Sequence, residues 1–364
     1  FEILIQNESL MGALSRVLKE DYKQSRDLVV NLMYIFFSFS NFSQLHGALT
    51  NYRVGNETMR VIDLELKRHN IRLKELQTMT RICSLQDRCE QVPSELWSAL
   101  HRLGDYKKAR KKVTLSSEER GVYDATTVAE SANLSSIGTH HKSLDLQKER
   151  NKVRQFIKKQ DKLLFICFHV LMNIAEDVQI ERKIVKRKCI EYLASVLERT
   201  NAELLILAVG FLKKLSIFEE NKNQMVEQAI VPKLVKFIPC NNKGLMQVVC
   251  KLLLNLSFDH ALREEMVKSS LIPKLVELLK HAPFRQISLK ILYHLSMDDR
   301  CKSMFTYTDC IPIVMQLLVN FPNSKIPIEL IALTINLSHN ARNAEMLCNG
   351  NGLKELFERV IRCR

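Results

Sequence analysis

One pattern recurs along this chain at intervals of about 40 residues. Its copy at 252–259 reads LLLNLSFD and places an asparagine between two runs of aliphatic residues. Related stretches are VLMNIAED (170–177), FLKKLSIF (211–218), ILYHLSMD (291–298) and LTINLSHN (333–340). The aligned positions, 41, 41, 39 and 42 residues apart, are Asn173, Lys214, Asn255, His294 and Asn336. Self-similarity at this period is typical of helical arrays in which each unit is stabilised by its neighbours.

A single copy shows what each unit contains. Residues 261–269 predict a short amphipathic helix, and 272–280 predict a second helix with Pro273 in its first turn, where a missing N–H costs nothing. Residues 285–297 are apolar at helical spacing and predict a third. Three helices in about 40 residues are typical of armadillo repeats, whereas HEAT repeats have two. We therefore expect an all-α, right-handed superhelical armadillo solenoid.

A long insertion interrupts the expected array. Armadillo repeats are predicted at 1–70 and again at 161–364, the last one incomplete, with 71–160 inserted between the second and third helices of one repeat. Residues 67–160 hold 20 Lys and Arg against 11 Asp and Glu, or +9 of the net charge of +14. The middle of the insertion is rich in Ser, Thr and Ala, so we expect 113–147 to be disordered. Its charged flanks predict helices that extend the neighbouring solenoid helices.

Both ends carry apolar helix faces that only a neighbouring unit can cover. The chain opens with FEILI, in which Phe1, Ile3, Leu4 and Ile5 are apolar. It closes with a predicted second helix that has no third, carrying Leu353, Leu356, Phe357 and Val360. We therefore expect the native solenoid to continue in both directions.

The composition bears on the fold class, on the redox state of the compartment and on membrane insertion. Apolar residues make up 46% of the chain, and Gly (10) and Pro (8) are few, as suits a helical array. Ten cysteines form no CxxC pair, and several lie among aliphatic residues, which favours a reducing compartment. Residues 28–52 carry no charge, but polar residues interrupt them throughout, so they predict a buried helix and no membrane insertion.

No residue pattern indicates catalysis. A glycine-rich phosphate loop is absent, and Cys83, Cys89 and His101 match no familiar zinc spacing. We expect no enzyme activity, no cofactor, no metal and no small-molecule substrate.

A basic patch lies in the insertion. It consists of Lys107, Lys108, Arg110, Lys111 and Lys112. Such density is typical of a nuclear import signal or of a patch for an acidic partner, but also of a solvated loop. Few aromatic residues lie nearby to stack bases, so we do not expect nucleic acid as the partner.

The recurring polar positions predict a groove. Third helices line the inner face of an armadillo array, and the residue one turn before each recurring position shares that face. An amide there can bond the backbone of an extended partner or the end of a neighbouring helix. The tryptophan that importin-like receptors place one turn earlier is missing, and lysines stand at several of these positions, which favours acidic partner segments. The candidate groove residues are His169, Asn173, Lys214, Lys251, Asn255, Lys290, His294 and Asn336.

Several stretches resemble the kinesin-associated protein family. They include YIFFSFSNFSQLHGALTNY, LLLNLSFD and LYHLSMDDRCKSMFTYTDCIP, and the resemblance covers roughly 1–70 and 160–364 but not most of 80–150. It implies a non-catalytic adaptor subunit of heterotrimeric kinesin that binds the tails of two motor chains and links them to cargo adaptor proteins. It also implies a cytoplasmic, microtubule-associated protein that serves plus-end-directed and intraciliary transport. The alternative is a catenin-like or importin-like scaffold that binds extended acidic peptides.

Overall fold

The computed structural model describes residues 8–21, 23, 25–88, 91–103, 139–321 and 325–362. Every regular element within these ranges is helical. The chain forms two compact units, residues 1–187 and 188–364. The prediction of an all-α armadillo fold is confirmed.

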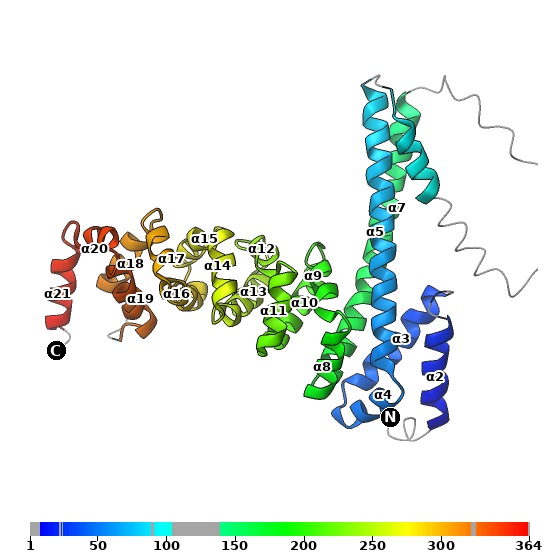
Figure 1. Ribbon diagram of the computed structural model, residues 1–364, viewed down its shortest axis with the longest axis horizontal. Coiled ribbons are helices and arrows are strands. Elements are labelled where there is room, and N and C mark those ends of the chain that lie inside the picture. The colour runs from blue at the N-terminus through cyan, green and yellow to red at the C-terminus, as the bar shows by residue number, and fades with distance from the viewer. Residues whose placement is uncertain are drawn as a thin grey trace, which may run out of the picture. The chain divides into compact units, whose positions relative to one another are not determined.

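The first unit is built around two long helices. Helices α5 (Val54–Asp87) and α7 (Thr139–Ile174) lie side by side as a hairpin (Figure 1), and a further helix spans 94–103. Gly55 makes room for this pairing, since a Cβ there would lie 2.9 Å from Ile174 Cδ1. The other elements of the unit are α2 (Glu8–Asp21), α3 (Arg26–Ser40), η1 (Ser43–Leu45), α4 (His46–Asn51) and α8 (Val178–Lys186).

A buried polar cluster anchors the base of the hairpin. The carboxylate of Glu65 on α5 accepts a hydrogen bond from Gln160 Nε2 of α7 at 2.8 Å. The same carboxylate pairs with Arg68 and lies 3.4 Å from the Arg26 guanidinium of α3. Because a buried charge is costly without partners, this cluster favours one alignment of α3, α5 and α7.

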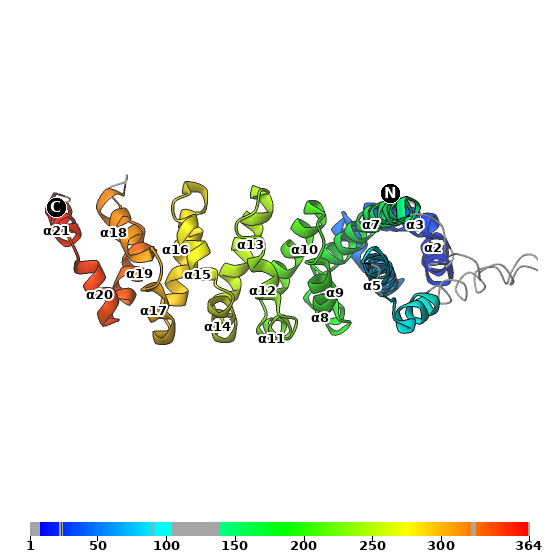
Figure 2. The same cartoon turned by 90° about the horizontal axis from the view of Figure 1, so that it is seen from above.

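The second unit is a run of three-helix repeats. Its third helices, α10 (Ala202–Leu215), α13 (Lys243–Leu256), α16 (Ala282–Ser296) and α19 (Ile328–Ser338), pack in sequence order along the unit (Figure 2). The first helices are α11 (Glu219–Glu227), α14 (His260–Lys268), α17 (Asp299–Phe305) and α20 (Ala341–Cys348). The second helices are α9 (Cys189–Val196), α12 (Ile230–Val235), α15 (Leu271–Leu278), α18 (Cys310–Asn320) and α21 (Gly352–Arg362).

Local sequence explains where these helices begin. Asn201 and Asn242 cap α10 and α13, and Asp259 caps α14, each side chain accepting a backbone N–H in the first turn. Pro273, expected in the first turn of a second helix, lies there in α15, and Pro232 and Pro312 take the same place in α12 and α18. A residue with positive φ directly precedes three of the second helices: Lys188 before α9, Ala229 before α12 and Ser270 before α15. Arg53, before α5, has positive φ as well.

The repeat pattern also sets the core. The residue directly after each recurring polar position is apolar and almost fully buried, as Leu256 and Leu295 show with 0% exposure. Burying such a side chain is worth ~1.5–3 kcal/mol. The same register holds at Ile174, Leu215 and Leu337.

The insertion is only partly described. The helical extensions predicted at its flanks are present, because α5 continues past residue 71 and α7 begins before residue 160. Both predicted domain boundaries therefore fall within continuous helices. The basic patch and most of 113–147 lie outside the described residues.

The described helices differ from membrane-spanning segments in length or in apolar character. Within the described part of the chain, no single helix is long and apolar enough to cross a membrane. Most of the uncharged stretch lies in Arg26–Ser40 and Ser43–Asn51, two segments bent by 116° that are long and apolar enough only when taken together. Buried residues of α3 include Leu32, Met33 and Phe36.

Of the two apolar ends of the chain, the structure describes the side chains of the C-terminal one. Phe1, Ile3, Leu4 and Ile5 lie outside the described residues. On α21, Leu353, Phe357 and Val360 are exposed, and Leu356 is half-buried.

Candidate protein-binding surface

The recurring amides join neighbouring third helices. Asn255 Nδ2 on α13 donates to Ser216 Oγ at the end of α10, over 3.1 Å. Asn336 Nδ2 on α19 makes the same bond to Ser296 Oγ of α16 at 3.0 Å. In the first unit, Asn173 Nδ2 on α7 lies 3.1 Å from Ser40 Oγ of α3. The amide nitrogens thus bond the end of a neighbouring helix, one of the two roles expected of them.

The serines complete a repeated motif. Ser40, Ser216, Ser257 and Ser296 are almost fully buried, and each hydroxyl donates to the carbonyl three residues earlier in its own helix. Because a serine hydroxyl has one hydrogen, its oxygen is left to accept the bond from the next repeat. The motif satisfies polar groups at the end of one third helix and ties it to the next.

His294 takes the asparagine position in α16. Its Nδ1 lies 2.7 Å from Ser257 Oγ, whose hydrogen is directed to the carbonyl of Leu254. Nδ1 must therefore carry the hydrogen of this pair. Burial lowers the pKa of His294, and the nearby charges of Arg263 and Lys290 lower it further. The ring is neutral at neutral pH and replaces the amide donor.

The predicted lysines lie in three different settings. Lys251 on α13 is exposed, and Lys214 on α10 is half-buried. Lys290 Nζ on α16 lies 3.6 Å from a carboxylate oxygen of Glu329 at the start of α19. The positive field expected along these helices is therefore partly neutralised at Lys290.

The ring of His169 packs against two phenylalanine rings. Its ring lies edge-on to Phe37 of α3 and Phe165 of α7, with centroids 5.0 and 5.7 Å away. His169 and Asn173 belong to the first unit, whereas the other six predicted groove residues lie on α10, α13, α16 and α19 of the second. The structure therefore brings those six onto one set of packed helices.

Sequence reasoning missed an apolar row beside these positions. Ile217, Phe258 and Met297, which we call the apolar row, are 70%, 68% and 56% exposed. Each stands three residues after a recurring polar position and directly after a buried serine. The Phe258 ring packs on His294 of the next repeat, with centroids 4.4 Å apart. The repeat register was a signal that could have found the row.

The described residues hold no assembled metal site. No group of three His, Cys, Asp or Glu side chains in them is placed to hold a metal ion. Burial raises the pKa of the Cys250 and Cys310 thiols to about 12, which suppresses their thiolate forms.

Solved structures with similar folds include armadillo proteins. A designed armadillo repeat protein shares 13% identity, with a TM-score of 0.44 over 54% of this chain and 86% of that one. The armadillo repeats only protein from Plasmodium falciparum shares 15%, with a TM-score of 0.41 over 49% and 87%. A structure from work on the cadherin and beta-catenin interaction shares 16%, with a TM-score of 0.48 over 63% and 47%.

A family comparison covers the whole chain. The model described as Kinesin-associated protein (KAP) matches residues 1–364. The match spans the insertion as well, which the stretches quoted above did not cover. This chain therefore belongs to the kinesin-associated protein (KAP) family.

Proposed function

We propose that this chain is a non-catalytic adaptor subunit of a heterotrimeric kinesin that binds the tails of two motor chains through its second unit. Family membership supports association with kinesin. The proposal extends to cargo adaptor proteins as further partners, and to plus-end-directed transport on cytoplasmic microtubules and within cilia.

The apolar row is the observation that supports a binding surface on the second unit. Three successive repeats expose a large apolar side chain at one register, and such patches on soluble proteins mark interaction sites. Lys251 adds exposed positive charge on the third helix that precedes Phe258. A tail segment with apolar side chains and flanking acidic residues would match both features.

The test is direct binding of the paired motor tails to the 364-residue chain. We expect a saturable complex whose affinity falls as salt is raised, because part of it rests on charge. Lys251→Glu should weaken it by about 1 kcal/mol or less, as expected for one exposed charge contact.

A matched control keeps the charge change but moves it off the proposed surface. Lys162→Glu alters an exposed lysine of α7 in the first unit and should leave the affinity unchanged. Failure of the paired tails to bind the folded chain at all would overturn the proposed function.

A further inference from the structure

The helix at 94–103 divides one side of the hairpin into two cavities. Leu96, Ala99, Leu100 and Leu103 recur at helical spacing and line the spaces between this helix and α5. Leu100 faces one cavity of about 250 Å³, and the other three face a second of about 470 Å³. The two cavities differ in how their charges are satisfied.

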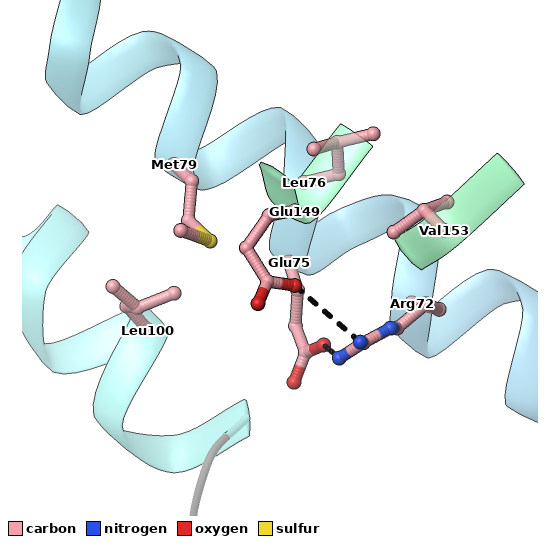
Figure 3. A pocket seen from close by; sticks show the side chains of 7 residues that line it. All are labelled: Arg72, Glu75, Leu76, Met79, Leu100, Glu149 and Val153. Atoms are coloured by element: carbon pink, nitrogen blue, oxygen red, sulfur yellow. Dashed lines mark hydrogen bonds and ion pairs between the residues drawn. The ribbon is translucent and has the colours of Figure 1, made fainter. Parts of the chain in front are cut away.

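The charged side chains at the smaller cavity form ion pairs with one another or with a neighbouring lysine. The Arg72 guanidinium donates to the carboxylates of Glu75 and Glu149, at 3.1 and 3.4 Å, and Figure 3 marks these contacts with dashed lines. Lys152 Nζ donates a hydrogen bond to the other carboxylate oxygen of Glu149 at 2.8 Å. The remaining lining is apolar, including Met79 and Leu100. This cavity has no uncompensated charge to attract a ligand.

The larger cavity has the opposite character. Lys74 and Arg81 of α5 and Arg102 of the 94–103 helix line it, and no carboxylate is part of its lining. No described carboxylate forms an ion pair with any of these three cations. Its apolar lining, Leu96, Ala99 and Leu103, comes from the 94–103 helix, and the uncharged Gln77 and Thr78 complete the side formed by α5. We call this cavity the basic groove.

The contrast holds along α5 itself. From residue 57 to 75, the cations of α5 other than Lys74 pair with carboxylates of the same helix: Arg60 with Glu57, Lys67 with Asp63, Arg68 with Glu65, and Arg72 with Glu75. The pairing stops where the basic groove begins, at Lys74 and Arg81. Positive charge is thus left uncompensated only where α5 meets an apolar recess.

We propose that the basic groove is a docking site for an acidic amphipathic helix of a partner protein, separate from the apolar row of the second unit. The apolar face of that helix would cover Leu96, Ala99 and Leu103, and its carboxylates would meet Lys74, Arg81 and Arg102. The partner helix would pack against α5 and the 94–103 helix, and docking of a helix into such a groove is a common mode of recognition.

The lining favours a helix over other anionic partners. No aromatic side chain lines the basic groove to stack bases, as single-stranded nucleic acid would need. The apolar residues are recessed between two helices, whereas membrane-binding helices present their apolar face outward. A recess with charged walls fits an apolar stripe flanked by acidic residues.

Trp97 provides a local readout. It is the only tryptophan in the chain, lies on the 94–103 helix and is 44% exposed. Titrating the full chain with a synthetic amphipathic helix of glutamate and leucine should shift Trp97 emission saturably. A scrambled peptide of the same composition should bind about tenfold more weakly, because its apolar residues no longer lie on one face.

The variants test the charges. Lys74→Glu with Arg81→Glu should weaken binding by about tenfold or more, and Lys74→Gln with Arg81→Gln by less. Lys158→Glu with Lys162→Glu makes the same charge change at exposed positions of α7 and should leave binding within about twofold. Unchanged Trp97 emission in each free variant shows that the 94–103 helix is still in place.

Three results would overturn the proposal. The first is equal binding of the peptide to the reversed-charge variant and the original chain. The second is equal binding of the ordered and scrambled peptides, which would indicate charge attraction alone. The third is tighter binding to oligo(dT) or to phosphatidylserine vesicles than to the peptide, which would assign the groove to nucleic acid or membrane.

Discussion

Asn255 donates a hydrogen bond to the hydroxyl of Ser216, which lies 39 residues earlier in the chain and at the end of the preceding third helix, over 3.1 Å. The same pair recurs as Asn336 with Ser296. The asparagine that stands among aliphatic neighbours therefore links one repeat to the next. Its side-chain nitrogen finds its hydrogen-bond acceptor within the fold.

This link should have a measurable energy. Asn255→Ala should lower the free energy of unfolding by about 1 kcal/mol, since it removes a half-buried hydrogen bond to a buried hydroxyl. Ser216→Ala should remove the same bond, so the two changes together should cost less than their sum. Urea denaturation of the original chain, the two single variants and the double variant measures the coupling energy between Asn255 and Ser216. Gln247→Ala, at an exposed position of α13, is the control and should stay within about 0.5 kcal/mol.

His294 should make stability depend on pH. Its pKa is lowered in the folded chain, so below about 6.5 the unfolded chain binds the proton first. Stability should then fall as the pH drops from 7 toward 5. His294→Asn keeps a donor for Ser257 and should flatten this part of the profile, whereas exposed His339→Asn should not. Parallel profiles for the original chain and His294→Asn would contradict the assignment.

Ala229 is a site where glycine should stabilise the fold. It has φ of +48° before α12 and is exposed, so a glycine there relieves backbone strain without loss of packing. Ala229→Gly should raise the free energy of unfolding by about 0.5–1 kcal/mol. Ala208→Gly, inside α10 and fully buried, should lower it by ~1 kcal/mol or more. Thermal and urea midpoints would show whether the two changes have opposite signs.

The apolar row should affect binding more than stability. Replacing Ile217, Phe258 and Met297 together by serine should weaken the complex with the motor tails about tenfold or more, because exposed apolar anchors are lost. Helicity should be preserved, since these side chains are largely outside the core. Ile361→Ser, at an exposed apolar position of α21, is the control. A triple variant that binds as the original chain does would remove the row from the interface.

The sequence was sufficient for the repeat architecture because buried and polar positions recur in one register. Asn255 and its equivalents marked the third helices, and the charged flanks of the insertion predicted the extensions of α5 and α7. The bond from Asn255 to Ser216 was not predictable in its detail, because it depends on how two separate helices cross.

Two further features depend on packing that sequence alone does not reveal. The pairing of Lys290 with Glu329 joins different third helices and reduces the charge expected there. The exposure of Phe258 is likewise a property of the packed array, although its register is visible in the sequence.

Hydrogen–deuterium exchange of the full chain, with and without the paired motor tails, tests the central claim most directly. We predict slower exchange on binding at the ends of the third helices and the apolar row that follows them, over 210–218, 251–258 and 290–297. Exchange in α2 should be unchanged. Tail binding with no added protection in α13 or α16 would contradict the assignment of the motor-binding surface to the second unit.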